Sequence, residues 1–267
     1  MSNIHPSSVV DPAAKLGAGV EIGPFCIVGP QVELGDGAKL NGHVVVTGLT
    51  KIGAGTEIHS FAVIGGPPQT LKPVGADTRI TVGDNCQIRE HATIHPGTVG
   101  GGGLTSVGNN CLLMVGTHIG HDCHVGNNVV MANNGTLGGH VSLGDFVYVG
   151  GLSAIHQNVR IGAHAMIGGM TGVEQDVIPY GSVMGNRAFL AGLNIIGLKR
   201  RGFTRDQIHT LRRAYRMLFA DEGTLAERLA DVVEEFGTSD VVMDVVAFMQ
   251  ADSARSFILP RADRGGA

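Results

Sequence analysis

The sequence has no tryptophan, few other aromatic residues and no long apolar run. Aromatic residues make up 4% of the 267 residues, which favours a core too thin to hold large rings. No segment approaches the ~20 consecutive apolar residues of a membrane span. The N-terminal residues MSNIHPSS lack the basic and apolar regions of a secretory signal. A formal charge of −4 gives no general reason to expect nucleic acid or an acidic membrane as partner.

The dominant feature of the sequence is a repeat of six residues. Aliphatic residues occupy every sixth position from Ile4 to Ile64, then Val82, Ile88 and Ile94, then every sixth position from Val107 to Val173. This period fits neither an amphipathic helix nor an ordinary strand. It fits a hexapeptide β-solenoid, in which each aliphatic residue points into a narrow core and the next residue opens a turn. Twenty-six hexapeptides, three to a coil, predict about nine stacked coils.

Two segments interrupt the repeat, and a third region lacks it altogether. The interruptions lie at residues 65–79, rich in proline and glycine, and at residues 100–105, which include Gly100–Gly103. We expect both to leave the solenoid as functional loops, although tolerated surface insertions are an alternative. After Val177, two capping boxes beginning at Thr204 and Thr224 predict helices. The chain therefore divides into a hexapeptide-repeat domain, residues 1–185, and a C-terminal α-helical domain, residues 186–267.

The four cysteines share one position in the repeat. Each lies four residues after a ladder residue, in a slot otherwise filled by small residues: Cys26, Cys86, Cys111 and Cys123. We expect them to face inward and to be reduced rather than to bind metal or form disulfides. A cytoplasmic location fits reduced cysteines.

Seven of the twelve histidines lie between His91 and His156. Counted modulo an eighteen-residue coil, one edge of the solenoid collects His118, His121, His140 and His156. His95 joins this edge if the glycine loop is excluded from the count, whereas His124 and His164 fall elsewhere. Such an edge could bind metal, carry inert surface polarity or act as a general base. The scarcity of nearby carboxylates and thiolates argues against metal. We interpret Asp122 as a turn residue rather than a catalytic partner.

Several longer motifs are more specific than the repeat. The chain resembles, essentially from end to end, the UDP-N-acetylglucosamine O-acyltransferases that open lipid A biosynthesis in Gram-negative bacteria. The resemblance is carried by Ile22–Pro30, Gln69 with Lys72, Thr93–Thr105, His118–Asn127, Gly139-His140, His156-Gln157 and Asn194–Phe203. It implies a left-handed parallel β-helix and a homotrimer whose active sites lie between subunits. It also implies no cofactor beyond the phosphopantetheine that acyl carrier protein brings with the acyl group.

The resemblance also implies residue roles. His121 matches the general base that takes the proton from the sugar 3-hydroxyl as it attacks the thioester, without a covalent enzyme intermediate. The backbone N–H of Gly139 matches an oxyanion donor. Positions that hold the sugar, diphosphate or acyl group are matched by His118, His140, His156 and Gln157. The first loop would contribute Gln69 and Lys72, the nucleotide would contact Asn194 and Arg201, and Arg200 would help to dock the acidic carrier protein.

Three positions bear on specificity. Thr70 stands where the family usually has an acidic residue, which suggests either an altered acceptor, the 3-amino analogue of the sugar, or simple tolerance. Ile196 replaces a residue that is often acidic beside the nucleotide. Gly169 matches the position where a bulky side chain shortens the acyl chain, so we expect about twelve to fourteen carbons, subject to the neighbouring Met170.

Other functions remain as alternatives. The later N-acyltransferase of the same pathway carries an extra N-terminal domain, whereas this ladder starts at Ile4. An acetyltransferase that uses coenzyme A is less compatible with the helical domain and the basic cluster Lys199–Arg201. A structural or binding solenoid without catalysis is the non-enzymatic alternative, and replacement of His121 would leave its function intact.

Overall fold

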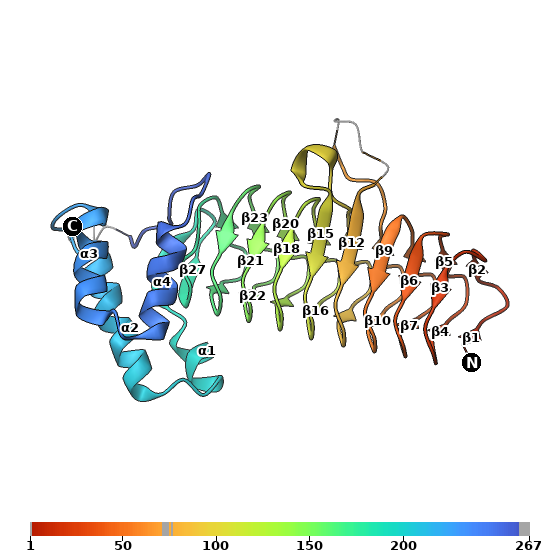
Figure 1. Ribbon diagram of the computed structural model, residues 1–267, viewed down its shortest axis with the longest axis horizontal. Coiled ribbons are helices and arrows are strands. Elements are labelled where there is room, and N and C mark those ends of the chain that lie inside the picture. Colours follow the sequence, from red (N-terminus) through yellow and green to blue (C-terminus); the bar gives the residue numbers. More distant parts are fainter. Residues whose placement is uncertain (1, 71–74, 76, 262–267) are drawn as a thin grey trace.

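The chain winds into a long three-sided solenoid with a helical domain at its C-terminal end (Figure 1). The computed structural model describes residues 2–70, 75 and 77–261. The N-terminus lies at the end of the solenoid opposite the helices, and the coils stack along one axis between them (Figure 1).

Three parallel sheets form the sides of the solenoid, and each coil contributes one strand to each. The first sheet contains β1 Asn3–Ile4, β4 Glu21–Ile22, β7 Lys39–Leu40, β10 Glu57–Ile58, β13 Gln87–Ile88, β16 Leu112–Leu113, β19 Val130–Met131, β22 Tyr148–Val149, β25 Met166–Ile167, β27 Gly181–Met184 and β28 Phe189–Leu193. The second contains β2 Val9–Val10, β5 Ile27–Val28, β8 Val45–Val46, β11 Val63–Ile64, β14 Thr93–Ile94, β17 His118–Ile119, β20 Thr136–Leu137, β23 Ala154–Ile155 and β26 Gly172–Val173. The third contains β3 Lys15–Leu16, β6 Val32–Leu34, β9 Leu49–Ile52, β12 Arg79–Val82, β15 Leu104–Val107, β18 His124–Val125, β21 Ser142–Leu143 and β24 Arg160–Ile161.

The strand register confirms a coil of three hexapeptides. Asn3 pairs with Glu21 and Val130 with Tyr148, each eighteen residues further along the chain. The hexapeptide repeats and the parallel strand order make this the predicted left-handed β-helix, an exception to the right-handed rule for parallel crossovers. Two coils carry insertions, because Arg79 pairs with Leu49 before it and Leu104 after it. Arg79, Leu104 and Thr105 therefore belong to strands and not to the predicted loops.

The repeated aliphatic residues fill the narrow interior. Residues such as Ile58, Leu113 and Ile119 have no exposed surface, and full burial of an aliphatic side chain contributes about 1.5–3 kcal/mol. The first coil is less covered, and Ile4 is 40% exposed. All four cysteines are free and buried, as predicted.

One short helix interrupts the solenoid, and the other helices follow its last strand. A 3₁₀ turn, η1 Val99–Gly101, lies within the second loop, and the C-terminal domain contains α1 Ile195–Arg200, α2 Arg205–Leu218, α3 Leu225–Phe236 and α4 Asp240–Gln250. Both predicted capping boxes are formed, by Thr204 with Gln207 and by Thr224 with Glu227. Strands β27 and β28 form an antiparallel pair that reaches Leu193, beyond the predicted division at residue 185. Among the described residues, no helix has the length and apolar character that crossing a membrane requires.

Two edges of the solenoid carry distinctive side chains. The turns between the second and third sheets form the histidine edge, defined here as His95, His121, Asp122, His140, His156 and Gln157. The turns between the first and second sheets form the aromatic edge, defined as Phe25, His43, Phe61 and His91. Several of these turn residues have positive φ, including Asp122 at 58° and His140 at 61°. Because equivalent turns have the same backbone geometry, the side chains of successive coils line up along common edges.

Candidate active site

A histidine–carboxylate pair stands at the centre of the histidine edge. Nδ1 of His121 lies 2.8 Å from Oδ2 of Asp122, whose side chain is completely buried. A carboxylate only accepts hydrogen bonds, so this contact places the imidazole proton on Nδ1. Nε2 then carries the free lone pair, and 17% of the His121 side chain remains exposed. Such an arrangement can orient an imidazole for proton abstraction.

The glycine loop holds Asp122 in place. The Thr98 N–H lies 2.9 Å from Oδ1, and the Thr98 hydroxyl donates to Oδ2 at 2.7 Å. A Cβ on Gly101 would lie 2.2 Å from Oδ2, and one on Gly97 would lie 2.8 Å from Oδ1. Glycine is therefore needed at residues 97 and 101, because the loop backbone approaches the carboxylate closely there.

These contacts correct the interpretation of Asp122. Its φ of 58° does make it a turn residue, but its carboxylate also contacts His121 directly. Burial raises the pKa of Asp122, but hydrogen bonds from Thr98 and then His121 outweigh this effect and lower it overall. Asp122 consequently stays ionised, and it can both orient His121 and stabilise the imidazolium form.

Gly139 keeps the space beside the His121 ring free of a side chain. The register places Gln157 above Gly139 and Gly139 above His121, and it places His156 above Gly138. A Cβ on Gly139 would lie 2.5 Å from Cε1 of His121, so any larger residue would displace the ring. Among the hydrogen bonds of the described residues, none is donated by the Gly139 N–H. This donor is available to a reacting oxygen.

His95 and His118 form a second imidazole pair next to this centre. Their ring centroids are 4.9 Å apart in an edge-to-face arrangement, and Thr93 Oγ1 lies 2.8 Å from Nδ1 of His118. Burial lowers the pKa of His95 to about 4, with smaller contributions from His118 and His121. Burial also lowers the pKa of His118. Both rings are therefore neutral near pH 7, and His95 does lie on the predicted edge.

His140 and His156 complete the edge, with partners that the sequence did not indicate. The His140 ring packs edge-to-face on His121 with centroids 5.0 Å apart, and its Nε2 lies 3.9 Å from Asp122 Oδ2. His156 Nδ1 lies 2.6 Å from the Arg255 guanidinium. Sequence reasoning missed both Thr98 and Arg255. His124, on β18, and His164, at another edge, fall outside the cluster as predicted.

The residues proposed from the first loop are only partly described. Gln69 is exposed, and the N–H of Thr70 donates to the carbonyl of Pro68 at 2.9 Å. Lys72 lies outside the described residues. The roles of Gln69, Thr70 and Lys72 therefore stay predictions.

The basic residues near α1 form a separate hollow. A cavity of about 450 Å³ is lined by Tyr148, Met166, Asn194, Ile196, Gly197, Arg200 and Arg201. Asn194 also caps α1 by accepting from the Gly197 N–H, and its Nδ2 donates to the His164 carbonyl. Tyr148 and Met166 belong to the first sheet, whereas the histidine edge follows the second. Within one chain, the sequence-predicted residues thus fall into two groups.

The positions assigned to acyl length lie near the aromatic edge. Gly169 has one atom within 4 Å of an added Cβ, the Gly151 carbonyl oxygen at 3.4 Å, so a side chain would fit there. Met170 is 72% exposed, and Leu152 one coil earlier is 62% exposed. These exposed apolar side chains are suitable contacts for an acyl tail.

A metal could be imagined between His121, Asp122 and His140, whose ligand atoms lie within 4.8 Å of one another. The donor set is a poor fit, because Asp122 already accepts hydrogen bonds from the Thr98 N–H, the Thr98 hydroxyl and His121. Metal coordination would have to replace some of these contacts. The hydrogen-bonded pair favours acid–base chemistry, and the expectation of no catalytic metal remains a prediction.

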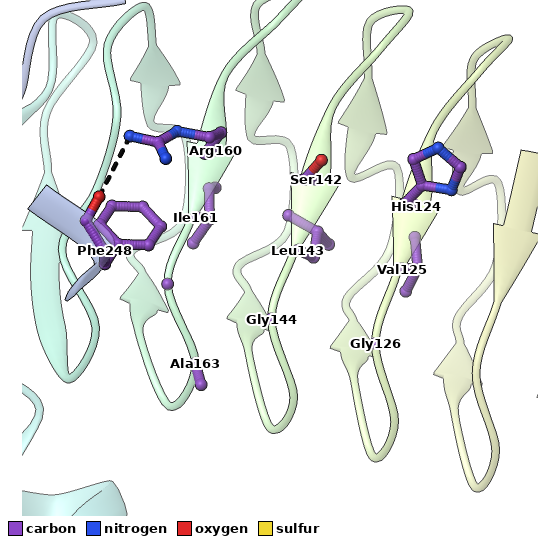
Figure 2. Close-up of a pocket in the computed structure, with 11 residues that line it drawn as sticks. His124, Val125, Gly126, Ser142, Leu143, Gly144, Arg160, Ile161, Ala163 and Phe248 are labelled. Carbon is purple, nitrogen blue, oxygen red and sulfur yellow. Dashed lines mark hydrogen bonds between the residues drawn. The ribbon is translucent and has the colours of Figure 1, made fainter. Parts of the chain in front are cut away.

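Another hollow, on the third sheet, contains none of the predicted catalytic residues. About 420 Å³ in volume, it extends along His124, Ser142 and Arg160 and ends at Phe248 (Figure 2). Arg160 binds Asp176 at 2.7 Å, and its guanidinium lies over the Phe248 ring, 4.5 Å from the centroid. The positive charge of Arg160 is thus neutralised by Asp176. Arg160 also connects β24 to α4 through its contact with Phe248.

Comparison with known proteins places these features in a family. Residues 176–258 match the family model described as Udp N-acetylglucosamine O-acyltransferase, domain 2, and residues 13–48 and 104–139 match bacterial transferase hexapeptide repeats. The chain is 46% identical over 266 residues to the acyl-[acyl-carrier-protein]–UDP-N-acetylglucosamine O-acyltransferase of Brucella ovis, covering 99% of this chain and 96% of that one.

Solved structures give the same result. The UDP-N-acetylglucosamine acyltransferase of Francisella novicida has a TM-score of 0.92 at 35% identity, over 96% of this chain and 94% of that chain. The enzyme of the same name from Campylobacter jejuni has a TM-score of 0.91 at 37% identity, over 97% of this chain and 100% of that chain. The similarity covers both the solenoid and the helical domain.

Proposed function

The chain belongs to the UDP-N-acetylglucosamine O-acyltransferase family, and we propose that it moves a 3-hydroxyacyl chain from acyl carrier protein to the 3-hydroxyl of UDP-N-acetylglucosamine. This reaction is the first step of lipid A biosynthesis. The observation that carries the proposal is the His121–Asp122 pair, in which Nε2 of His121 adjoins the space that Gly139 leaves without a side chain. Membership of an enzyme family also removes the support for a purely structural solenoid.

In the proposed mechanism His121 acts as general base. Its Nε2 accepts the proton of the sugar hydroxyl while that oxygen attacks the thioester carbonyl carbon. The Gly139 N–H donates to the developing oxyanion, a type of contact typically worth about 3 kcal/mol in the transition state. The intermediate then collapses, the C–S bond breaks, and the phosphopantetheine sulfur takes the proton from His121. Asp122 stabilises the positive charge on the imidazole throughout.

This mechanism needs no covalent acyl-enzyme. Cys123 is the cysteine closest in sequence to His121, and it is fully buried. Burial raises the pKa of Cys123 to about 12, so its thiolate form is scarce at neutral pH. Direct attack by the sugar hydroxyl therefore fits the site better than a two-step transfer through sulfur.

The nucleotide would bind in the hollow formed by Asn194, Arg200 and Arg201. Arginine forks suit diphosphate oxygens, and the Tyr148 and Met166 side chains offer an apolar surface to a base. Because this hollow and the histidine edge lie on different sheets, the proposed homotrimer would complete each site from two neighbouring copies. The remaining substrate contacts are assigned to His118, His140, His156 and Gln157, together with Gln69 and Lys72.

Acyl carrier protein would approach the basic residues of α1 and α2. Arg200 is one proposed contact, and a cavity of about 600 Å³ near α2 is lined by His209, Arg212 and Arg216 among others. These positive charges complement an acidic carrier protein. The acyl tail would extend toward Gly169 and Met170, with room for about twelve to fourteen carbons. The free cysteines support a cytoplasmic location for the reaction.

A direct test is acyl transfer with carrier proteins loaded with 3-hydroxyacyl chains of different lengths, using UDP-N-acetylglucosamine as acceptor. Turnover should peak at twelve to fourteen carbons, and Gly169→Met should shift the peak to shorter chains. Turnover with acetyl coenzyme A as donor, and none with any acylated carrier protein, would contradict the proposal.

Thr70 supports a second candidate reaction, N-acylation of the 3-amino analogue of the sugar. A neutral hydroxyl replaces the acidic side chain that the family usually presents near the acceptor. A competition assay with equal amounts of both acceptors separates the two reactions. A clear preference for the hydroxyl sugar eliminates the amino alternative, whereas a clear preference for the amino sugar replaces the main proposal.

A further inference from the structure

The chain segment that follows α4 returns to the solenoid and is fixed against its last coils (Figure 1). The N–H of Asp176 donates to the Ser256 carbonyl, and the N–H of Ile258 donates to the Asp176 carbonyl, both at 2.9 Å. The Ser253 hydroxyl binds the buried carboxylate of Asp176 at 2.6 Å. Ile258 is itself buried. The backbone on both sides of Arg255 therefore has a defined position.

Arg255 reaches from this segment to the histidine edge. One terminal nitrogen of its guanidinium lies 2.6 Å from Nδ1 of His156 and 2.9 Å from the carbonyl oxygen of Gln157. No carboxylate forms an ion pair with Arg255 within the part of the chain that the structure describes. Its positive charge is directed at the substrate-binding side of the edge rather than neutralised.

This contact determines which nitrogen of His156 carries the proton. Nδ1 of His156 also lies 3.3 Å from the Gln157 carbonyl oxygen, but its contact with the guanidinium is much shorter, at 2.6 Å. Because a guanidinium has donors and no acceptor, Nδ1 provides its lone pair to Arg255. In the neutral imidazole the proton then sits on Nε2. His156 thereby presents an N–H donor, whereas Asp122 makes His121 present a lone pair. Two imidazoles on neighbouring parts of one edge are held in opposite tautomers.

We propose that Arg255 is a positioning residue that fixes His156 as a hydrogen-bond donor to an acceptor oxygen of the substrate. The inference rests on the proposed function, because it assigns His156 to the bound substrate. In the strand register His156 follows Gly138 and Gly139 follows His121, so the two imidazoles occupy adjacent positions of the histidine edge. The C-terminal segment thus contributes to the site although Arg255 follows His156 by 99 residues.

The first test reads the tautomer without using activity. Two-bond ¹H–¹⁵N correlation spectra distinguish protonated from unprotonated ring nitrogens, and loss of signals in His156→Gln identifies those of His156. We expect Nε2–H in the wild type and a shift toward Nδ1–H in Arg255→Met. A wild-type ring protonated on Nδ1, or an unchanged tautomer in Arg255→Met, overturns the proposal. This readout decides the point even if the chain transfers no acyl group.

The second test measures coupling between the two side chains. Arg255→Met should lower kcat/KM about tenfold in the wild-type background and should have little further effect in His156→Gln. Arg255→Lys should restore part of the loss. Ser256→Ala is the matched control, because it removes the 2.6 Å contact with Gln175 on the same segment without touching His156. Equal losses in Ser256→Ala and Arg255→Met, or full additivity with His156→Gln, would show a merely structural role.

Discussion

Two edges of the solenoid carry histidines, and they differ in what contacts each ring. On the aromatic edge, Phe25, His43, Phe61 and His91 stack face to face with successive centroids 4.9, 5.0 and 5.2 Å apart. Within the described residues, no side-chain hydrogen bond is recorded for His43 or His91. On the histidine edge, Nδ1 of His121 and Nδ1 of His156 each have a hydrogen-bonding partner, and so does Nδ1 of the adjoining His118 on β17.

The comparison shows that an imidazole becomes a candidate for catalysis through its partner and not through its place in the repeat. Both edges arise from the same turn geometry, and both bring histidines from different coils together. Stacking leaves His43 without a defined tautomer, whereas Asp122 makes one nitrogen of His121 a base. The same fold therefore stacks rings in a column at one edge and orients imidazoles by hydrogen bonds at another.

Replacement of Asp122 by Ala is expected to have the largest effect in this set. It removes the partner of His121 and leaves the Thr98 N–H and hydroxyl without their acceptor. We expect kcat to fall about 10²-fold and the free energy of unfolding to fall by about 1–3 kcal/mol. Asp145→Ala, in a different edge, is the control for loss of a turn carboxylate. Comparable activity loss in both variants would remove the distinction between the two kinds of edge.

Gly139→Ala tests the close approach of the coils at the reactive edge. The new methyl group would lie 2.5 Å from the His121 ring and must displace it. We expect a loss of about tenfold or more in kcat/KM, since small displacements of a catalytic group are costly. Gly42→Ala is the control beside the aromatic edge, where the nearest atom is 3.3 Å from an added Cβ. Full activity of Gly139→Ala would show that His121 does not need this space.

Acid should destabilise the protein through His95 on the histidine edge. The folded-state pKa of His95 is about 4, below its ordinary value, because burial disfavours the charged ring. The unfolded chain therefore binds more protons between pH 6.5 and 4, and His95 should cost up to about 3 kcal/mol of stability as pH falls through that range. Urea unfolding at several pH values should give a flatter profile for His95→Gln. An unchanged slope in that variant would contradict the assignment.

Phe61→Ala should produce the smallest effect and should act on stability alone. Phe61 stacks between His43 and His91 but is half exposed, so we expect a loss of about 1 kcal/mol in the free energy of unfolding. The rate of acyl transfer should stay within about twofold of the wild type. Chemical denaturation and an activity assay check this together, and a large loss of activity would give the aromatic edge a role in function.

The sequence predicted most of the scaffold and the location of the histidine edge. The six-residue period predicted a coil of three hexapeptides, and phase placed His118, His121, His140 and His156 on one side. His95 joined them once the glycine loop was excluded from the count. Phase could not show that the Asp122 carboxylate contacts His121, because that depends on side-chain direction within a turn. Thr98 lies in a segment without a period, and Arg255 follows His156 by 99 residues, so neither could be located from spacing. Asn194, Arg200 and Arg201 were identified by resemblance alone.

The most direct test of the central claim compares His121→Ala with His43→Ala in one acyl-transfer assay. The donor is 3-hydroxyacyl carrier protein of the preferred chain length, and the acceptor is UDP-N-acetylglucosamine. Loss of the oriented base should lower the rate about 10²–10⁴-fold in His121→Ala, whereas His43→Ala should stay within about twofold of the wild type. Equal rates for the two variants would contradict the claim that the Asp122 partner distinguishes the reactive histidine from the stacked one.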